Sequence, residues 1–553
     1  MQQSPLKNSR DSQNGGEKLI DHDKAPRNEP GYTTGLPLVV TLSSLVLAVY
    51  LMLLDTSIVS TAIPRITTTF HSLNDVGWYG TAYLVTNCAV QPLSGKLYTY
   101  FNSRWTFLAF FTVFELGSAI CGAAQSSNML IVGRALAGIG SSGLLNGAFT
   151  ILHASVPAER LPQVTGVLMG LSQLGLLSGP LIGGALTQHA SWRWCFYINL
   201  PCAAIIYPAL FLIRVPNHRA HSIKAQPLRN TLLTLDPIGF ILFAGAIVQL
   251  LFALNWGGTS YAWASAIIIG LFAGSAATFL LFLVWEYRMG ESAMIPFALA
   301  RRRIIWSSCL SYGLTMGAII CCTYYLPMYF QAVRGSSPTG SGVSLLPSIA
   351  PNIVFAMAAG VLVGRLGYYL PFSLLGASLT TTGTALLTTL TPTTSTARWV
   401  SFQVLQGIGR GLSIQMPLHA VTHDAPAGTH SIATGLVVLS QNLGGAVFLS
   451  LCQVVFSTGL NNGLGQYAPG VDAVVVEAAG ASGVRDVVGR DSGVLDGVLR
   501  AYNGAIMNVM YVATAAAAGS LVFACGMGWV NVNGKKGKAE EGAQMGQGNS
   551  NTD

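Results

Sequence analysis

Fourteen apolar runs dominate this sequence, each long enough to cross about 30 Å of hydrocarbon as a helix, which takes roughly 20 residues. They span 37–63, 78–98, 105–125, 128–151, 163–186, 195–214, 237–256, 263–284, 305–330, 343–363, 370–391, 399–418, 431–456 and 505–530. Only 9% of the residues are charged, too few to cover a soluble surface. The pattern predicts an all-α polytopic membrane protein with fourteen transmembrane helices in a lipid bilayer.

The placement of positive charge predicts the topology. With an even number of spans and an inside N-terminus, twenty Lys and Arg residues fall in inside segments and seven in outside segments. All eight lysines are among the inside residues. The net charge of +8 is therefore interpreted as a topology signal, and no nucleic-acid partner is expected. The polar tails 1–36 and 531–553 are predicted to be disordered and cytosolic.

Short sequence matches indicate an internal duplication. Leu171-Ser172-Gln173 recurs as Leu439-Ser440-Gln441 at an offset of 268, and Gly138-Ile139-Gly140 recurs as Gly407-Ile408-Gly409 at an offset of 269. We interpret this as two six-helix halves, 37–214 and 305–530, separated by 215–304 with two extra helices. The second half includes an exofacial loop at 457–504. Parallel repeats of this kind are typical of transporters, in which two halves rock around a cleft.

Four ionisable residues stand out inside the predicted spans, where charge is costly and functional roles are the default expectation. They are Asp55, Glu115, Arg134 and Arg410. Desolvation favours the neutral form of Asp55, as a proton-coupled carrier requires, and a permanent structural salt bridge is the alternative. Arg134 stays charged and is expected to pair with a carboxylate.

Glu115 is either the partner of Arg134 or a second proton site, with the structural role favoured. Arg410 either contributes to the site or extends toward the cytosolic surface, because helix 399–418 places it near that side. The repeated glutamines Gln173 and Gln441 are further candidates for contact with protons or substrate.

A glycine-rich run in helix 163–186 is expected to bring another helix close. Small residues remove side chains along one helix face, and a proline deletes a backbone donor and bends the helix. The run consists of Gly175, Gly179, Pro180, Gly183 and Gly184.

No enzyme, metal or cofactor chemistry is expected from the remaining motifs. The sequence has no GxxxxGK[ST] phosphate loop, so the expected energy source is a proton gradient. Seven of the nine cysteines lie inside apolar runs, and none has zinc-ligand spacing. No catalytic constellation converges at one membrane depth.

Together these motifs resemble the major facilitator superfamily, in particular its fourteen-helix drug:proton antiporter branch, over about residues 37 to 530. Residues 54–64, LDTSIVSTAIP, are similar to the first-helix signature of that branch, and Trp192 to Pro201 to a later block. Arg134 with Gly138 resembles the fourth-helix motif whose arginine is tied to proton coupling. The run from Gly175 to Gly184 resembles the antiporter motif.

The loop between the second and third helices departs from the family pattern. Gly95, Leu97 and Arg104 are kept, but the usual Asp is Thr99, whereas the second-half copy with Gly360 and Arg365 fits better. The variant resembles filamentous-fungal toxin and multidrug efflux pumps. That resemblance implies a monomeric plasma-membrane exporter of amphipathic small molecules, with both termini cytosolic. An importer or vacuolar carrier of a cationic or chelated solute, and a non-transporting membrane sensor, stay open as alternatives.

Overall fold

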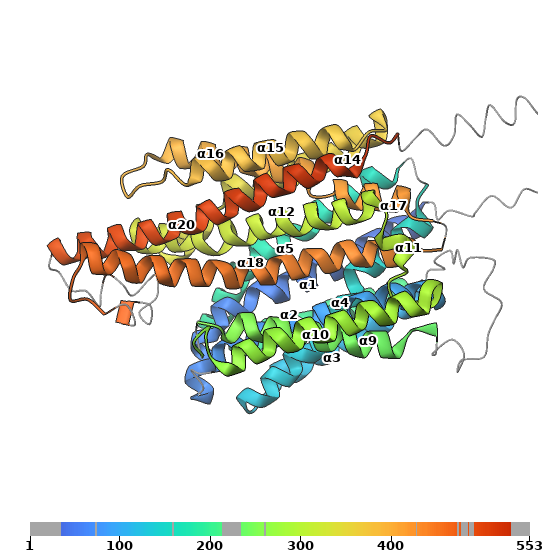
Figure 1. The fold of residues 1–553 in the computed structure, drawn as a ribbon, viewed down its shortest axis with the longest axis horizontal. Coiled ribbons are helices and arrows are strands. Elements are labelled where there is room, and N and C mark those ends of the chain that lie inside the picture. Colours follow the sequence, from blue (N-terminus) through green and yellow to red (C-terminus); the bar gives the residue numbers. More distant parts are fainter. Residues whose placement is uncertain are drawn as a thin grey trace, which may run out of the picture.

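The computed structural model describes residues 35–71, 75–157, 160–212, 234–258, 261–426, 428–472, 475–476, 485 and 492–531. The described chain is a helical bundle without named strands (Figure 1). The predictions of disorder in the two tails fall almost wholly outside the described residues. Helix α18 extends to Tyr467 and α20 begins at Ser492, so both helices run into the range 457–504 for which an exofacial loop is expected. Most of the remaining residues of that range lie outside the described residues.

The first group of helices covers residues 36–212. It contains α1 (Leu36–Phe70), α2 (Val76–Tyr100), α3 (Ser103–Gly122), α4 (Ser127–Ser155), α5 (Leu161–His189), α6 (Trp194–Tyr197) and α7 (Asn199–Leu212). Helix α1 packs along α5, and α4 packs against both α2 and α3. Their buried apolar side chains form one continuous core.

Two helices, α9 (Pro237–Trp256) and α10 (Ala266–Met289), follow the first group and pack against each other. Asp236 caps α9 by accepting a hydrogen bond from Gly239 N at 3.0 Å, and the helix begins at Pro237, where the predicted apolar run 237–256 starts. Apolar residues of α9 share a core with residues of α2 and of a later helix, α18. Helix α9 therefore covers the line along which α2 meets α18.

The second group of helices covers residues 303–524. It contains α12 (Arg303–Met328), η3 (Tyr329–Val333), α13 (Pro338–Val343), α14 (Leu346–Leu366), α15 (Leu370–Leu387), α16 (Thr396–Ser413), α17 (Met416–Asp424), α18 (His430–Tyr467) and α20 (Ser492–Ala524). The short elements η2 (Gly290–Ser292) and α11 (Phe297–Ala300) precede it, and η4 (Cys525–Met527) follows. Helix α12 packs on α18 and α20, and α16 packs on α14 and α15.

A helix occupies each of the fourteen ranges predicted from the sequence, but the count of fourteen spans is not confirmed. By length and composition, twelve helical segments of the described residues qualify as membrane spans. The two ranges outside these twelve contain α2 and the α16–α17 pair, which carry more polar residues than the others. The all-α membrane fold itself is confirmed.

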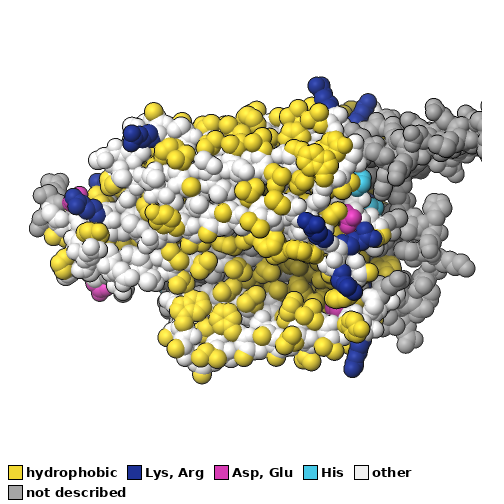
Figure 2. Space-filling view, turned by 45° about the horizontal axis from the view of Figure 1, so that its top comes forward, with side chains coloured by type: hydrophobic (Ala, Val, Ile, Leu, Met, Phe, Trp, Pro, Cys, Tyr) yellow, Lys and Arg dark blue, Asp and Glu magenta, His cyan; other side chains and the backbone are white. Residues whose placement is uncertain are grey.

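Both described ends of the chain lie at one end of the bundle, because α1 begins and α20 ends there (Figure 1). We call this the terminal end. Lys and Arg side chains gather at the terminal end, and hydrophobic side chains cover much of the surface between the two ends (Figure 2). Exposed side chains such as Ile241, Leu280 and Val354 belong to this apolar surface. An apolar belt between polar ends is the surface that a bilayer requires.

The two groups meet from mid-bundle to the terminal end. Asn442 of α18 donates a hydrogen bond to Asn87 Oδ1 of α2 at 2.7 Å, and the hydroxyls of Thr150 and Ser431 lie 3.2 Å apart. Helix α5 crosses α14 so closely that a Cβ on Gly360 would overlap the Pro162 carbonyl. These contacts hold the terminal ends of the two groups together.

Candidate functional site

A buried ion pair joins α1 to α4 in the first group. Arg134 Nη1 lies 2.5 Å from Asp55 Oδ2, and the exposed fractions of the two side chains are 2% and 0%. Arg134 Nε also donates to the Tyr79 carbonyl at 2.9 Å, and its guanidinium lies 4.5 Å from the centre of the Tyr83 ring. Arg134 therefore links three helices, α1, α2 and α4, through one charge.

The second carboxylate oxygen of Asp55 has no hydrogen-bond partner among the described residues. A buried carboxylate with one unsatisfied oxygen is a costly arrangement, because buried polar atoms are almost always hydrogen-bonded. Protonation at this oxygen would remove the charge that holds Arg134. The geometry thus pairs Arg134 with a carboxylate and leaves one oxygen of Asp55 without a partner among the described residues.

The glycine run of α5 positions Asp55. A Cβ on Gly175 would overlap the Tyr50 carbonyl, and a Cβ on Gly179 would overlap the Ser57 side chain. Gly183 packs in the same way against Thr61, so three glycines at four-residue spacing seat α1 on α5. Gly184 differs, because a Cβ there would meet nothing within 4 Å. Pro180 lies inside α5, which continues past it to His189.

Glu115 of α3 is buried but is not the partner of Arg134. Its exposed fraction is 5%, and neither carboxylate oxygen has a hydrogen-bond partner among the described residues. Asp55, Cys202 and Tyr207 lie within its electrostatic range. Glu115 is thus a second buried carboxyl near the ion pair, and the structural role favoured from the sequence lacks an observed contact.

Gly138 of α4 packs against α2, and Gly95 and Leu97 of the loop motif belong to the last turns of α2 itself. A Cβ on Gly138 would overlap Thr86 and the Tyr83 carbonyl, so this glycine lets α4 approach α2. At the terminal end Gly95 faces the backbone of Ile432 on α18, and half-buried Leu97 joins the core of the first group. Arg104 donates to the Phe211 carbonyl at the end of α7.

The sequence reasoning assigned no site role to the lysine of this loop motif. Lys96 is 1% exposed and donates to the carbonyls of Thr234 at 2.7 Å and Ser292 at 2.6 Å, on either side of α9 and α10. Asp236 and Glu286 lie within its electrostatic range. The lysine therefore joins α2 to the inserted helices. Its place in the loop motif, at the end of a predicted helix, was the sequence feature that could have indicated this role.

In the second group, Arg410 lies deeper than the sequence suggested. Helix α17 follows α16 with only Ile414 and Gln415 between them, which puts Arg410 near the middle of the α16–α17 pair. Its exposed fraction is 5%, so the side chain does not reach the surface. Gln441 Oε1 of α18 has no hydrogen-bond partner in the part of the chain that the structure describes, and Gln173 of α5 is half-buried. The structure brings none of these three residues into hydrogen-bond contact with Asp55 or Arg134.

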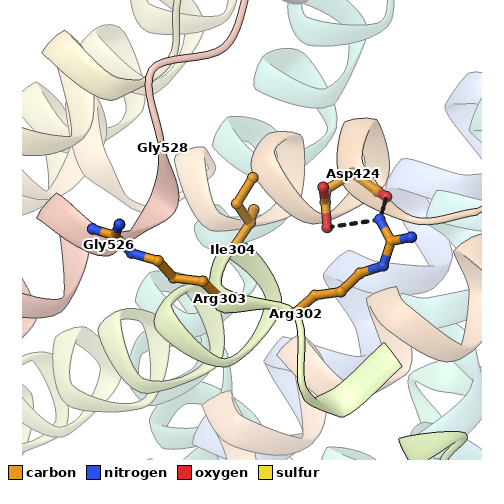
Figure 3. Close-up of a pocket in the computed structure, with 6 residues that line it drawn as sticks. All are labelled: Arg302, Arg303, Ile304, Asp424, Gly526 and Gly528. Carbon is orange, nitrogen blue, oxygen red and sulfur yellow. Dashed lines mark hydrogen bonds and ion pairs between the residues drawn. The ribbon is translucent and has the colours of Figure 1, made fainter. Parts of the chain in front are cut away.

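The motif residues Gly360 and Arg365 lie on α14 at the terminal end. Gly360 lies against α5, whereas Arg365 is exposed in the last turn of α14. A shallow pocket at this end is lined by Arg302, Arg303, Ile304, Asp424, Gly526 and Gly528 (Figure 3). In this pocket Arg302, which directly precedes α12, forms an ion pair with Asp424 of α17 at 3.4 Å and so joins the two helices. The residues that line the pocket do not include Asp55 or Arg134.

Comparison with known proteins places this architecture in a family. The profile of the Major Facilitator Superfamily matches residues 45–449. The MFS-type transporter pigP of Monascus ruber is 48% identical over 92% of this chain and 89% of its own length. The efflux pump mlcE of Penicillium citrinum is 47% identical over 93% of this chain and 94% of its own length.

Two solved structures share the fold at low sequence identity. A bacterial homologue of the human lysosomal transporter Spinster, in an inward-facing and unoccupied conformation, matches with a TM-score of 0.53 and 15% identity, covering 90% of this chain and 98% of that one. A double-tryptophan mutant of XylE matches with a TM-score of 0.56 and 13% identity, covering 87% and 94%. This protein is a multi-pass transporter, and it belongs to the major facilitator superfamily.

Proposed function

We propose that this transporter exports an amphipathic small molecule, a secondary metabolite, toxin or drug, in exchange for protons that enter the cell. The buried Asp55–Arg134 pair carries the proposal, because it places a titratable group where three helices are held by one arginine. The likeness to an efflux pump over nearly the full chain supports the outward direction. The established family makes the chain a transporter and not an enzyme.

A proton can supply enough free energy to change this site. Breaking a buried pair by removing one charge costs about 3–5 kcal/mol. A proton that moves down a gradient of about two pH units and a potential of about 100 mV releases about 5 kcal/mol. The two energies are of the same order, so protonation of Asp55 coupled to proton entry can release α1 from Arg134.

In this proposal the two six-helix halves, 37–214 and 305–530, rock against each other as rigid units. Their helices begin at matching intervals, since α4 and α16 start 269 residues apart and so do α5 and α18. Contacts such as Asn87–Asn442 and Thr150–Ser431 close the terminal end in this conformation. Alternating access requires these contacts to break when the opposite end closes, and proton and substrate must bind the two states with different affinities.

We place the terminal end in the cytosol and the protein, as a monomer, in the plasma membrane. The positive-inside rule supports this orientation, because Lys and Arg gather at the terminal end (Figure 2). Inside-out vesicles from plasma and vacuolar membranes test both the compartment and the direction. Uptake by the plasma-membrane vesicles is the expected result, and uptake only by vesicles of the opposite sidedness would favour the importer.

The coupling claim is tested in intact cells that overexpress the protein. Cells are loaded with a panel of amphipathic dyes, and their efflux is followed before and after an ionophore collapses the pH gradient. Efflux above that of non-expressing cells should stop when the gradient collapses. Efflux that continues unchanged would contradict proton coupling, and binding without net movement of any dye would favour the sensor.

A further inference from the structure

One face of α16 carries four buried polar side chains in succession. Trp399, Gln403, Gln406 and Arg410 follow one another at spacings of four, three and four residues, so they form a single stripe along the helix. Their exposed fractions are 9%, 0%, 1% and 5%. We call them the α16 stripe. Eleven residues separate its ends, which corresponds to about 16 Å along the helix axis.

The α16 stripe faces the interior of the second group. On one side of it Gly407 and Gly411 lie against the backbone of α14, and on the other side Gly409 lies against α15. Ser401, on the opposite face of the helix, is exposed. The Cys322 thiol of α12 lies within electrostatic range of Arg410. Cys322 also lies beside Gln406, so the stripe faces the side of α12 that carries this thiol.

Polar atoms along the α16 stripe lack protein partners. Among the described residues, no hydrogen-bond partner exists for Trp399 Nε1, for either amide atom of Gln403, or for Arg410 Nε. The amide of Gln406 has only the Cys322 thiol of α12 beside it. Three side chains with unsatisfied atoms along one stripe are unusual, because buried polar groups in folded proteins are nearly all hydrogen-bonded. A ligand with acceptor and donor groups would satisfy them together.

The charge of Arg410 has no counter-charge, in contrast to that of Arg134. Arg410 is the only buried Asp, Glu, Lys or Arg among the described residues of 305–530, and no described carboxylate lies within ion-pair distance of it. An uncompensated buried cation is strongly unfavourable. At the offset of 269 residues, Arg134 of the first group corresponds to Gln403, so the second group has a neutral side chain at the position of the paired arginine and an unpaired arginine two turns away.

We propose that the α16 stripe binds an anionic group, a carboxylate, of the exported molecule. Arg410 neutralises the anion, the amides of Gln403 and Gln406 hydrogen-bond its polar atoms, and Trp399 contacts its apolar part. The ring of Phe330 already packs on Trp399 with centroids 4.9 Å apart, so aromatic surface is present at that end of the stripe. The inference rests on the proposed export function and adds the class of substrate to it.

Equilibrium binding to the purified full-length protein tests the proposal. Naphthoate, pyrenebutyrate and dodecanoate are each compared with their primary amides, which keep the apolar part and lose the charge. At least one carboxylate should bind the wild type on the order of tenfold to a hundredfold more tightly than its amide. Arg410→Gln should abolish this preference, and Arg410→Lys should keep part of it because the charge remains.

Matched controls separate a binding role from a structural one. Arg365→Gln removes an exposed arginine of the same group and should leave the preference intact. Amide binding by Arg410→Gln within about twofold of the wild type shows that the variant is folded. If Arg410→Gln does not retain amide binding, Gln406→Leu is measured in its place. This variant should lower the preference for the carboxylate over its amide.

Three outcomes would overturn the proposal: no carboxylate preferred over its amide, a preference that survives Arg410→Gln, or binding of chloride alone. None of these outcomes would contradict the proposed function, because proton-driven efflux is measured separately and depends on Asp55.

Discussion

Removing the charge of Arg134 should destabilise the protein far more than removing both charges of its ion pair. In the Arg134→Gln variant, Asp55 would remain buried at 0% side-chain exposure without its cation. Breaking such a pair from one side costs about 3–5 kcal/mol, whereas replacing both members by neutral groups of similar size is often close to neutral. We therefore expect Asp55→Asn with Arg134→Gln to lose much less stability than the two single changes add up to.

The structure suggests that the Arg134→Gln cost lies toward the lower end of this range. In this variant, protonation of Asp55 would remove its unpaired charge. The Tyr79 carbonyl would also lose the Arg134 Nε donor, which lies 2.9 Å away in the wild type. A hydrogen bond from a charged donor contributes about 1.5–3 kcal/mol. We expect about 3 kcal/mol for Arg134→Gln and a coupling of about 2 kcal/mol in the double-mutant cycle.

The unfolding free energy of the purified protein in mixed detergent and SDS micelles measures this cycle. Arg410→Gln is the matched control, because it also neutralises a buried arginine but leaves no carboxylate behind; its cost should stay below about 1 kcal/mol. Additive single and double costs, or an Arg410→Gln cost as large as that of Arg134→Gln, would refute the reasoning.

Three further variants probe the contacts around the site. Gly179→Ala should lower the free energy of unfolding by about 1–3 kcal/mol, because the added methyl group overlaps Ser57. Gly184→Ala should change the free energy of unfolding by less than about 0.5 kcal/mol, and equal costs for the two variants would contradict the packing of α1 on α5. Lys96→Met should loosen α9 and α10, which hydrogen exchange measures as faster exchange of the backbone amides at 290–296, and unchanged exchange would contradict the anchor. A disulfide between Thr150→Cys and Ser431→Cys, made in a background without native cysteines, should stop efflux until it is reduced; full efflux in the oxidised protein would contradict opening of the terminal end.

Most of the fold could be predicted from the sequence, because helix length and apolar composition are local properties. A helix was predicted in each of the fourteen ranges on these two properties, and the structure has a helix in each of them. Helix ends in polar or glycine-containing segments were less accurate. The ends of α18 and α20 extend well beyond the apolar runs, since helical hydrogen bonds continue past the residues that hydrocarbon requires.

The candidate site was predictable only in its charged members. Buried ionisable residues stand out in an apolar helix, so Asp55, Arg134 and Arg410 were identified, but their pairing depends on how the helices pack. The sequence leaves Glu115 open as the structural partner of Arg134 or as a second proton site, whereas in the structure the glycines of α5 seat α1 so that Asp55 contacts the arginine. The spacing of Gln403, Gln406 and Arg410 was visible in the sequence, but the unpartnered atoms of Gln403 and Arg410 were not.

The central claim is that Asp55 couples proton entry to substrate exit, and transport in proteoliposomes tests it most directly. The compound most strongly extruded from cells is used with wild-type protein and with Asp55→Asn, and both pH-gradient-driven accumulation and gradient-free exchange of the compound are measured. Wild type should do both, whereas Asp55→Asn should exchange the compound without accumulating it, because the two halves still rock but no proton is bound. Accumulation by Asp55→Asn at the wild-type level would contradict the claim.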